Sequence, residues 1–487
     1  MGKGSTWDVT GQSWVTKLEG NGRVNLSGTD NGSTNALHIG TLTGKHTFVV
    51  DLSHTNHLDS DMIYISGTGS TGVQTISLNS IEGLDQMENG DKLRFATVNA
   101  DENSLSFVSN EIGGGNTNRA MLRDTGVLNN AFIIDNEKYD TNKTDENSSY
   151  NGDEFGENKP GNAITDKNYG KGVAWFLQKN NSGDEISDAG KTIINMSKVN
   201  YSNAIYMDRL NKRLGEARYI NHEEEQGMWV RLRHDRIGKD DAFRSQNTMY
   251  ELGYDEKQSC DNGERRLGMA IDYMDGKAEY SGINGSGDIK RYGLWLYDTW
   301  LSDKGHYTDY VLKWGHLEND FDIYTMTRGE KVTGDYSNNV FSASAEYGKK
   351  NDMGNGWYFE PQAQLQLARV TGADYVTTQG SKVSVDGINS LIGRAGFRLG
   401  RDMDENSTVY VKADLLHEFM GDQTITAADA TGTLREEYEN KGTWYDVGFG
   451  FAAAVGKNSY AFMDFEKSFG NDNDETYQIN AGLQWTF

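Results

Sequence analysis

The N-terminal part of the sequence holds the residue types from which a metal site is usually built. His54 and His57 are close enough in sequence to share a metal ion, and His38 and His46 precede them. Imidazole is a common metal ligand and a general base near neutral pH, but histidines at strand edges or in loops need neither role. We therefore interpret all four as loop or strand-edge residues.

The same region offers no support for nucleophilic catalysis. Ser66, Ser70 and Ser77 have no evident base beside them, and no G-x-S-x-G or H-E-x-x-H motif occurs there. Two glycine clusters, residues 67–69 and 113–115, are better explained as turns than as phosphate-binding loops. We expect no catalytic residue, no cofactor and no metal ion, and hence a protein that is not an enzyme.

An acidic, Asn-rich stretch spans residues 135–162. It lacks the D-x-[DN]-x-[DN]-G spacing of a calcium-binding loop and has few apolar side chains. We interpret this stretch as an exposed loop or linker.

The composition indicates a large β protein with an acidic surface. The 487 residues include 57 Gly, 25 Tyr and 10 Trp but only 2 Pro, which suits many strands joined by turns. A net charge of −25 argues against a nucleic-acid partner, whose phosphates need a basic surface. The single cysteine, Cys260, excludes an internal disulfide framework.

Membrane insertion through a helix is not indicated, because no apolar run reaches the roughly 18 residues that a spanning helix needs. The mean hydropathy is −0.71. No apolar signal-peptide region follows Met1. If the protein is exported, we expect this chain to be the C-terminal piece of a longer precursor, or a chain whose true start lies before Met1.

Apolar and polar side chains alternate over residues 477–487. Because successive side chains of a strand point to opposite faces, this segment has one apolar face and one face of amides and a hydroxyl. That pattern suits a strand with lipid outside and a wet lumen inside. The apolar positions are Tyr477, Ile479, Ala481, Leu483, Trp485 and Phe487.

Twelve strand candidates occupy the C-terminal half, and an even number of antiparallel strands is typical of a bacterial outer-membrane barrel. We place tight turns at residues 275–276 and 400–401 and a long polar connection at 420–440. Trp295 and Tyr297 fall on the polar face of their segment, and we expect their rings inside the barrel. The candidates start near residues 228, 247, 264, 289, 306, 338, 357, 388, 407, 442, 458 and 476.

Helical periodicity precedes the first strand, over residues 192–219. Asp208 lies four residues before Lys212, the favoured order for a helix ion pair. About 20 residues at 1.5 Å each span ~30 Å, the thickness of a hydrocarbon core. So charged a helix cannot face lipid. It lies either inside a water-filled barrel or on a surface between two domains. The apolar spacing of three, four and three is set by Met207, Leu210, Leu214 and Ala217.

Residues 1–125 carry short apolar alternations separated by Gly, Asn, Asp and Ser clusters. Each run has two or three apolar residues, too few for a sandwich sheet. Stacked as the rungs of a solenoid, they would form one continuous core. We favour the solenoid, with a jelly roll or sandwich as the alternative.

These features resemble the translocator domain of type V secretion autotransporters. The similarity covers residues 220–487, and residues 1–125 look more distantly like the end of a pertactin-like passenger β-helix with its autochaperone cap. The matching segments are MDRLNKRLGEAR at 207–218, GMWVRLR at 227–233, RRLGMAIDYMDG at 265–276, RYGLWLYDTWL at 291–301 and YQINAGLQWTF at 477–487.

The resemblance implies an all-β fold: a 12-stranded antiparallel transmembrane β-barrel with a pore-spanning α-helix, preceded by a right-handed parallel β-helix segment. Residues 1–185 would be the end of the passenger, 186–220 the linker helix in the barrel, and 221–487 the translocator. The implied pore-helix residues are Met207, Arg209, Leu210, Lys212, Arg213, Leu214 and Arg218. The implied C-terminal signal for barrel assembly comprises Tyr477, Ile479, Leu483, Trp485 and Phe487.

The same resemblance implies a location and partners. The protein would lie in the bacterial outer membrane with its N-terminal region on the cell surface. It would export and anchor its own passenger, an adhesin or surface structure. Its partners would be outer-membrane lipid and lipopolysaccharide, the barrel-assembly machinery and periplasmic chaperones, with no nucleic acid, and we expect a monomer.

Some autotransporters cut themselves in the pore helix at an Asn beside acidic barrel residues. The helix predicted here contains Asn195, Asn200 and Asn203 but no Asn–Asn pair, and Asn180–Asn181 lies upstream. We therefore expect an intact chain. Two other functions stay open: a porin-like outer-membrane pore with an N-terminal β extension, and a soluble acidic all-β binding protein.

Overall fold

The computed structural model describes most of the chain as two compact units. The N-terminal unit comprises residues 1–190 with 325–330 and 428–434, and the barrel unit comprises 191–324, 331–427 and 435–487. The described residues are 1–27, 34–56, 59–67, 69–99, 104–109, 119–123, 125–140, 171–179, 186–219, 224–239, 242–325, 329–471, 473 and 475–487.

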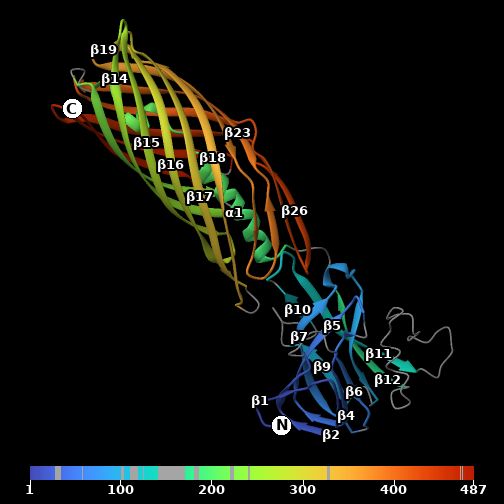
Figure 1. Ribbon diagram of the computed structural model, residues 1–487. Helices are drawn as coiled ribbons and strands as arrows, with labels where there is room; N and C mark the ends of the chain where they lie inside the picture. The colour runs from blue at the N-terminus through green and yellow to red at the C-terminus, as the bar shows by residue number, and fades with distance from the viewer. Residues whose placement is uncertain are drawn as a thin grey trace. The chain divides into compact units, whose positions relative to one another are not determined.

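Twelve long antiparallel strands close into a barrel (Figure 1). Each strand pairs with its neighbour, and the first and last strands pair with each other from Gly227↔Thr486 to Arg236↔Tyr477. The number of strands and their antiparallel order confirm the prediction. The strands are β13 (Gln226–Lys239), β14 (Phe243–Cys260), β15 (Gly263–Tyr280), β16 (Asn284–Ser302), β17 (His306–Tyr324), β18 (Lys331–Lys349), β20 (Trp357–Val370), β23 (Ile388–Asp404), β24 (Ser407–Glu418), β27 (Gly442–Gly456), β28 (Ser459–Phe469) and β29 (Tyr477–Thr486).

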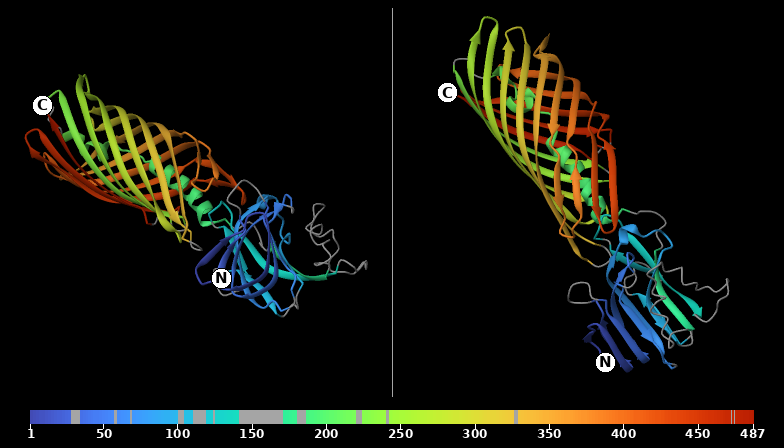
Figure 2. Two further views of the ribbon diagram at one scale, coloured as in Figure 1. Left: turned by 60° about the horizontal axis from the view of Figure 1, so that its bottom comes forward. Right: turned by 45° about the vertical axis from the view of Figure 1, so that its right-hand side comes forward.

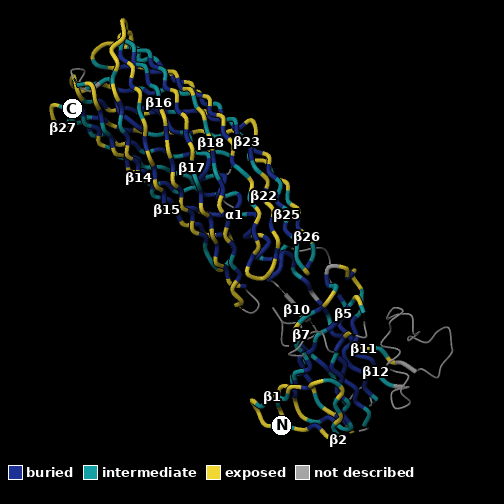
Figure 3. Tube along the Cα trace, in the orientation of Figure 1, coloured by how far each residue is buried: buried dark blue, intermediate teal, exposed yellow. Residues whose placement is uncertain are grey.

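The barrel wall is apolar outside and polar inside, as alternation along the strands requires. Buried and exposed residues alternate along the strands in Figure 3. On β15, Leu267, Met269 and Ile271 point outward with 50%, 55% and 56% of their surface exposed. On β16, Trp295 and Tyr297 are buried inside, as predicted.

Two turns predicted at Gly residues are wrong. Residues 275–276 lie within β15 and 400–401 lie within β23, while the chain reverses at 281–283 and 405–406. The reason is packing in the lumen, where these glycines leave room for a side chain on the neighbouring strand. A Cβ at Gly400 would overlap the Tyr358 ring, and one at Gly276 would overlap the amide of Asn247.

The polar connection predicted at 420–440 is also ordered as strands. Strands β25 (Asp422–Asp429) and β26 (Gly432–Glu439) form a hairpin, and β21 (Ala373–Val376) with β22 (Lys382–Val385) completes a four-stranded sheet. A short strand, β19 (Asn351–Gly354), pairs with the start of β20.

The N-terminal unit contains two sheets. From β1 to β9, successive strands of the chain belong to one sheet and then to the other in turn. Each of these strands pairs in parallel with the next strand of its sheet, which excludes the antiparallel sandwich. The handedness of this winding stays a prediction. One sheet has β1 (Ser5–Asp8), β3 (Gly22–Asn25), β5 (Thr47–Ser53), β7 (Gly72–Glu82) and β9 (Leu105–Ser109), and the other begins with β2 (Gln12–Gly20), β4 (Ala36–Gly44), β6 (Met62–Ile65) and β8 (Lys92–Val98).

The second sheet ends in three antiparallel strands: β12 (Lys171–Lys179), β11 (Asn130–Asp140) and β10 (Arg119–Arg123). The two sheets enclose one apolar core, and a short 3₁₀ helix, η2 (Leu84–Gln86), follows β7. Aromatic packing continues into the antiparallel part, where the rings of Phe107 and Trp175 lie 5.3 Å apart.

The helical segment differs from the single helix predicted over 192–219. Helix α1 (Asp188–Ala204) ends before Met207, and a five-residue helix, α2 (Leu210–Leu214), and a 3₁₀ turn, η5 (Ala217–Tyr219), follow. Arg209 has an extended backbone, and Gly215, with φ +58°, ends α2. Within the described residues, no helix is both long and apolar enough to cross a membrane.

Candidate functional site

The linker, defined as residues 191–219, runs through the lumen of the barrel. Its helical parts lie inside the ring of strands in every view (Figure 2). Leu210, Leu214 and Ala217 pack on aromatic side chains from the wall, among them Trp229 and Trp295. The linker touches strands on all sides, so the lumen is filled by the chain's own segment.

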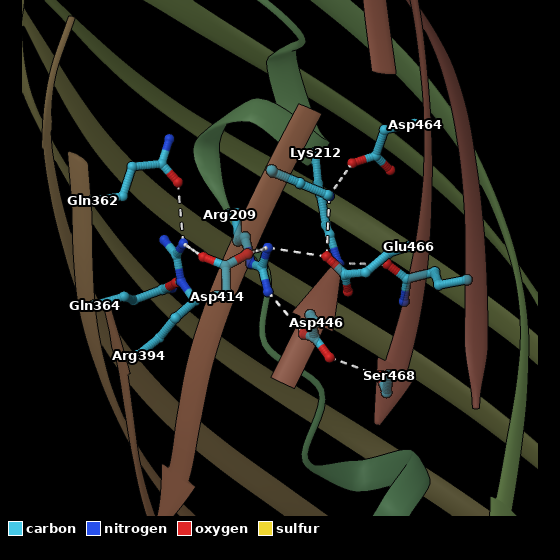
Figure 4. Close-up of polar contacts among 12 residues, drawn as sticks. Arg209, Lys212, Gln362, Gln364, Arg394, Asp414, Asp446, Asp464, Glu466 and Ser468 are labelled. Atoms are coloured by element: carbon cyan, nitrogen blue, oxygen red, sulfur yellow. Dashed lines mark hydrogen bonds and ion pairs between the residues drawn. The ribbon is translucent and has the colours of Figure 1, made fainter. Parts of the chain in front are cut away.

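Arg209 forms the centre of the polar contacts (Figure 4). Its Nη1 lies 2.7 Å from Asp414 Oδ2 and 3.0 Å from Glu466 Oε2, and its Nη2 lies 3.0 Å from Asp446 Oδ2. These carboxylates come from β24, β28 and β27. The extended backbone at Arg209 breaks the helix and lets one guanidinium reach three strands.

Lys212 and a wall lysine share one of these carboxylates. Lys212 Nζ donates to Glu466 Oε1 at 2.8 Å and to Gln478 Oε1 at 2.7 Å. Lys412 Nζ lies 3.0 Å from Glu466 Oε2 and also pairs with Asp464. The ion pair predicted between Asp208 and Lys212 is therefore wrong, because each finds a nearer partner on the wall.

Asp208 joins the linker to another part of the wall. Its Oδ1 lies 2.9 Å from Arg231 Nη1 on β13, and its Oδ2 lies 3.2 Å from Arg213 Nη1. Arg213 Nη2 also lies 2.6 Å from Asp309 Oδ1 on β17, and Arg213 stacks on the Tyr297 ring with 4.3 Å between Cζ and the ring centroid.

A further cluster holds the end of the linker. Glu216 Oε2 lies 3.0 Å from Arg398 Nη2, and Glu216 Oε1 lies 2.9 Å from Arg218 Nη1. Arg218 also lies 3.0 Å from Glu360 Oε2 on β20. Cations and carboxylates thus alternate between linker and wall over residues 208–218.

Tyr206 lies at the break between the two helices, among wall cations. Arg233 Cζ, Arg291 Cζ and Lys313 Nζ lie 4.1, 4.8 and 4.3 Å from its ring centroid. A positive group over an aromatic face is attracted by the ring quadrupole, more so when it is desolvated. The ring therefore accommodates three like charges that would otherwise repel one another across the lumen.

Helix α1 is held by neutral hydrogen bonds and one carboxylate. The amides of Asn200 and Asn338 donate to each other at 2.9 and 3.0 Å. Tyr201 Oη donates to Glu418 Oε2 at 2.7 Å, and Ser197 Oγ donates to Gln423 Oε1 at 2.7 Å.

These contacts position a peptide and leave little room for a ligand. A lumen cavity beside Tyr206, Met207 and Arg209 has a volume of about 180 Å³, below the ≈ 300 Å³ from which small-molecule pockets usually start. Buried ion pairs add little net stability, because desolvation offsets their attraction, yet removing one partner costs about 3–5 kcal/mol. Their main effect is to fix where the linker lies.

Each residue predicted for the pore helix lies in the lumen segment. Arg209, Lys212, Arg213 and Arg218 make the ion pairs above, Leu210 and Leu214 form the apolar core, and Met207 lines the cavity. The C-terminal residues lie on or just after β29, where Leu483 and Phe487 point outward with 46% and 49% of their surface exposed. Tyr477, Ile479 and Trp485 are half-buried on the same face. The assembly role of these C-terminal residues stays a prediction.

The wall carboxylates and arginines were missed by sequence reasoning. Asp414, Asp446, Glu466 and Arg398 all occupy inward positions of their strands and are at most 6% exposed. A signal for inward placement was present in the alternation, which is clearest at Asp446 between the outward Tyr445 and Val447. The pairs themselves depend on the register between distant strands.

Three of the four histidines of the N-terminal unit lie among the described residues, and each contacts another side chain. His54 Nε2 lies 3.1 Å from Asp91 Oδ2, His46 contacts Gln74, and His38 stacks between Trp14 and Tyr64. No cluster of three or more His, Cys, Asp or Glu fit for a metal ion exists within the described residues. Among earlier candidates, His57, Thr68, the 113–115 glycines, residues 141–162 and Asn180–Asn181 lie outside the described residues.

Comparison with known proteins adds the family. The autotransporter beta-domain family matches residues 226–466. The pertactin autotransporter of Bordetella bronchiseptica is 29% identical over 317 residues, which are 63% of this chain and 34% of that protein. The BrkA autotransporter of Bordetella pertussis is 28% identical over 323 residues, which are 64% of this chain and 31% of that protein. The chain therefore spans about a third of the length of these relatives.

Among solved structures, the beta domain of the Bordetella autotransporter BrkA covers 54% of this chain and all of its own length. The two share 26% sequence identity with a TM-score of 0.45.

Proposed function

Because this chain belongs to the autotransporter family, we propose that its barrel carries the chain's own N-terminal part across the bacterial outer membrane and anchors it at the cell surface. The apolar outer wall faces lipid in this arrangement, and the charged inner wall faces the chain that passes through. The linker remains in the lumen after transport and closes the pore.

The observation that carries this proposal is the charge match between linker and wall. Arg209 alone contacts carboxylates from three strands, and the linker as a whole pairs with strands around the barrel. A porin needs an open, hydrated lumen, which this segment fills. A soluble protein does not expose apolar side chains such as Leu267, Met269 and Ile271 over its outer wall.

Folding outside the cell makes transport proceed outward without the hydrolysis of a nucleotide. The parallel strands of the N-terminal unit stack one rung on the next, so each rung that emerges finds a template. The part of the chain that has folded outside is too wide to return through the lumen, which has room for only a single segment.

The proposed partners follow from the same arrangement. Lipid and lipopolysaccharide surround the outer wall, and periplasmic chaperones with the barrel-assembly machinery deliver the strands. An apolar face for that machinery is offered by Tyr477, Ile479, Leu483, Trp485 and Phe487. We expect a monomer, because the barrel closes on itself through β13 and β29 and leaves no wall strand unpaired.

The exported part is proposed to be a non-enzymatic adhesin or surface structure. Serine protease EspP of Escherichia coli is also similar, at 30% identity over 288 residues, but these residues are only 22% of that protein. Residues 1–125 of this chain carry neither a G-x-S-x-G nor an H-E-x-x-H motif.

Conductance across planar bilayers tests the proposal. The intact protein is expected to conduct little, and deletion of residues 192–219 is expected to raise conductance sharply, because the linker no longer fills the lumen. As a control, heat-dependent mobility on gels should show that the barrel is folded both in the intact protein and in the deletion variant. A large conductance of the intact protein would favour the porin instead.

A further inference from the structure

The outer wall carries an apolar groove with a cation at one end. The groove has a volume of about 570 Å³ and lies over β16, β17, β18, β20 and β23. Its lining includes Leu296, Leu312, Trp314, Phe341 and Leu367.

The floor of the groove is formed by the small side chain of Ala343, which lies between larger side chains on the neighbouring strands. Ala343 on β18 pairs across the sheet with Leu312 on one side and Leu367 on the other. Both leucines stand out from the wall, with 58% and 56% of their surface exposed, and Phe341 beside them is 53% exposed. The missing bulk at Ala343 therefore leaves a channel of the kind that an acyl chain fills.

Arg369 lies at one end of this groove. It points outward from β20, next to the last residue of that strand, and pairs across the sheet with Phe341 on β18 and Asn389 on β23. Arg369 Nη1 donates to Asn389 Oδ1 at 3.0 Å. Its guanidinium forms no ion pair with a carboxylate in the part of the chain that the structure describes.

An arginine on the lipid-facing wall of a barrel is unfavourable unless it reaches polar groups. A phosphate satisfies a guanidinium by paired, charge-assisted hydrogen bonds, and it arrives attached to the acyl chains that suit the groove. A ligand with both a phosphate and an acyl chain would therefore match the guanidinium and the apolar groove at the same time.

We propose that this groove binds lipopolysaccharide, with an acyl chain over Ala343 and a phosphate on Arg369. The leaflet follows from the proposed function. The same end of the wall contacts α1 on its inner side, where Val370 and Ile388 pack with Tyr201. The linker enters the barrel there from the exported part, so this rim faces the outer leaflet, where lipopolysaccharide resides.

Lipid analysis of the purified full-length chain tests the site. The chain is extracted from outer membranes in mild detergent, and bound lipopolysaccharide is quantified per chain by mass spectrometry. Arg369→Gln should lower retention about tenfold, since a hydrogen bond to a charged group contributes that much to affinity. Ala343→Phe should also lower it, because the ring would fill the groove between Leu312 and Leu367. Arg369→Lys should fall between the unchanged chain and Arg369→Gln, because an ammonium keeps the charge but cannot make the paired hydrogen bonds.

Arg401→Gln is the matched control. Arg401 is also exposed on β23, but it lies at the other end of that strand, 5.9 Å from the Trp357 ring centroid. This variant should retain as much lipopolysaccharide as the unchanged chain. Equal retention by Arg369→Gln, or retention of phospholipid in its place, would overturn the proposal.

Two readouts separate this proposal from the proposed function. Surface exposure of the N-terminal unit and low conductance report on export and closure. If both hold while Arg369→Gln retains its lipid, only the lipid site fails. If the N-terminal unit is found in the periplasm, the assigned leaflet and the proposed function fail together.

Discussion

Arg209 and Asp414 are 205 residues apart in sequence, yet Arg209 Nη1 donates a hydrogen bond to Asp414 Oδ2 at 2.7 Å. Asp414 in turn accepts a hydrogen bond at 2.7 Å from Arg394 Nη1 on the next strand. The linker is therefore built into the ion network of the wall rather than resting against it.

Removing the charge of Arg209 should loosen the linker. Arg209→Met leaves Asp414, Asp446 and Glu466 without this cation, and the loss of one partner of a buried pair costs about 3–5 kcal/mol. We expect brief large conductance openings in bilayers that the unchanged chain does not show. Arg435→Met serves as a control, because Arg435 is exposed and pairs only with Glu437 among the described side chains. Unchanged conductance of Arg209→Met would contradict the assigned role.

The thermal stability of the barrel should depend on the aromatic ring of Tyr206 and not on its hydroxyl group. The hydroxyl has no hydrogen-bond partner among the described residues, while Arg233, Arg291 and Lys313 surround the ring. Tyr206→Phe should keep the thermal stability of the barrel. Tyr206→Ala should lower it, because each cation–π contact contributes about 0.5–2 kcal/mol. Heat-dependent gel mobility measures both, and equal loss in the two variants would count against the cation–π explanation.

Gly400 should not tolerate a side chain. A Cβ at this position would overlap the Tyr358 ring, and overpacking typically costs about 1–3 kcal/mol. Gly400→Ala is expected to unfold at a lower temperature in the same gel assay. Gly456→Ala is the control, since its Cβ would lie 3.8 Å from the nearest atom. Equal stability of the two variants would contradict the packing argument.

The N-terminal unit should respond to pH through Asp61. Burial raises the pKa of this carboxyl from 3.8 to about 7, although it accepts hydrogen bonds from the backbone N–H groups of Asn35 and Asp51. Because the folded state holds the proton more tightly than the unfolded chain, stability is full below pH 4 and falls as pH rises from about 4 to 7, by up to about 4 kcal/mol. Above pH 7 it stays at the lower level.

Hydrogen exchange of residues 47–65 in the full-length chain measures this effect. After correction for the intrinsic pH dependence of exchange, protection at pH 5 should exceed protection at pH 7.5. Asp61→Asn should remove the difference. A pH dependence that survives this substitution would show that another group is responsible.

The chain should remain intact in the outer membrane. Asn203 Nδ2 donates to Val199 O at 3.0 Å and to Ser245 Oγ at 3.3 Å, so both hydrogens of the amide are engaged and neither partner is a carboxylate that could activate it. A denaturing gel should show one full-length band. A discrete fragment of barrel size would contradict this expectation.

Sequence patterns predicted the barrel because its strands obey a local rule. Alternation along β15 or β29 needs only the two faces of a strand, and the twelve segments could be counted without knowing which strands touch. The helix was harder, since the helical spacing from Met207 to Leu210 runs across Arg209, whose backbone is extended to reach three carboxylates. That break depends on partners more than 200 residues away.

The glycines show the same limit of local sequence patterns, which do not report contacts between strands. Asp275–Gly276 is a strong local turn signal, but the space beside Asn247 in the lumen requires a residue without a side chain. Likewise, Asp414 and Glu466 could be placed inside by alternation. Their pairing with Arg209 required the register of the closed barrel.

Cross-linking within the lumen tests most directly whether the linker passes through the barrel. Asn200 on α1 and Asn338 on β18 exchange amide hydrogen bonds at 2.9 and 3.0 Å. With Cys260 replaced by Ser, the pair Asn200→Cys and Asn338→Cys should be joined efficiently by a short bismaleimide in intact outer membranes. The pair Asn200→Cys and Asn389→Cys should not, because Asn389 points outward from the wall. Absence of the first cross-link in a folded barrel, or equal yields for both pairs, would contradict a linker held in the lumen.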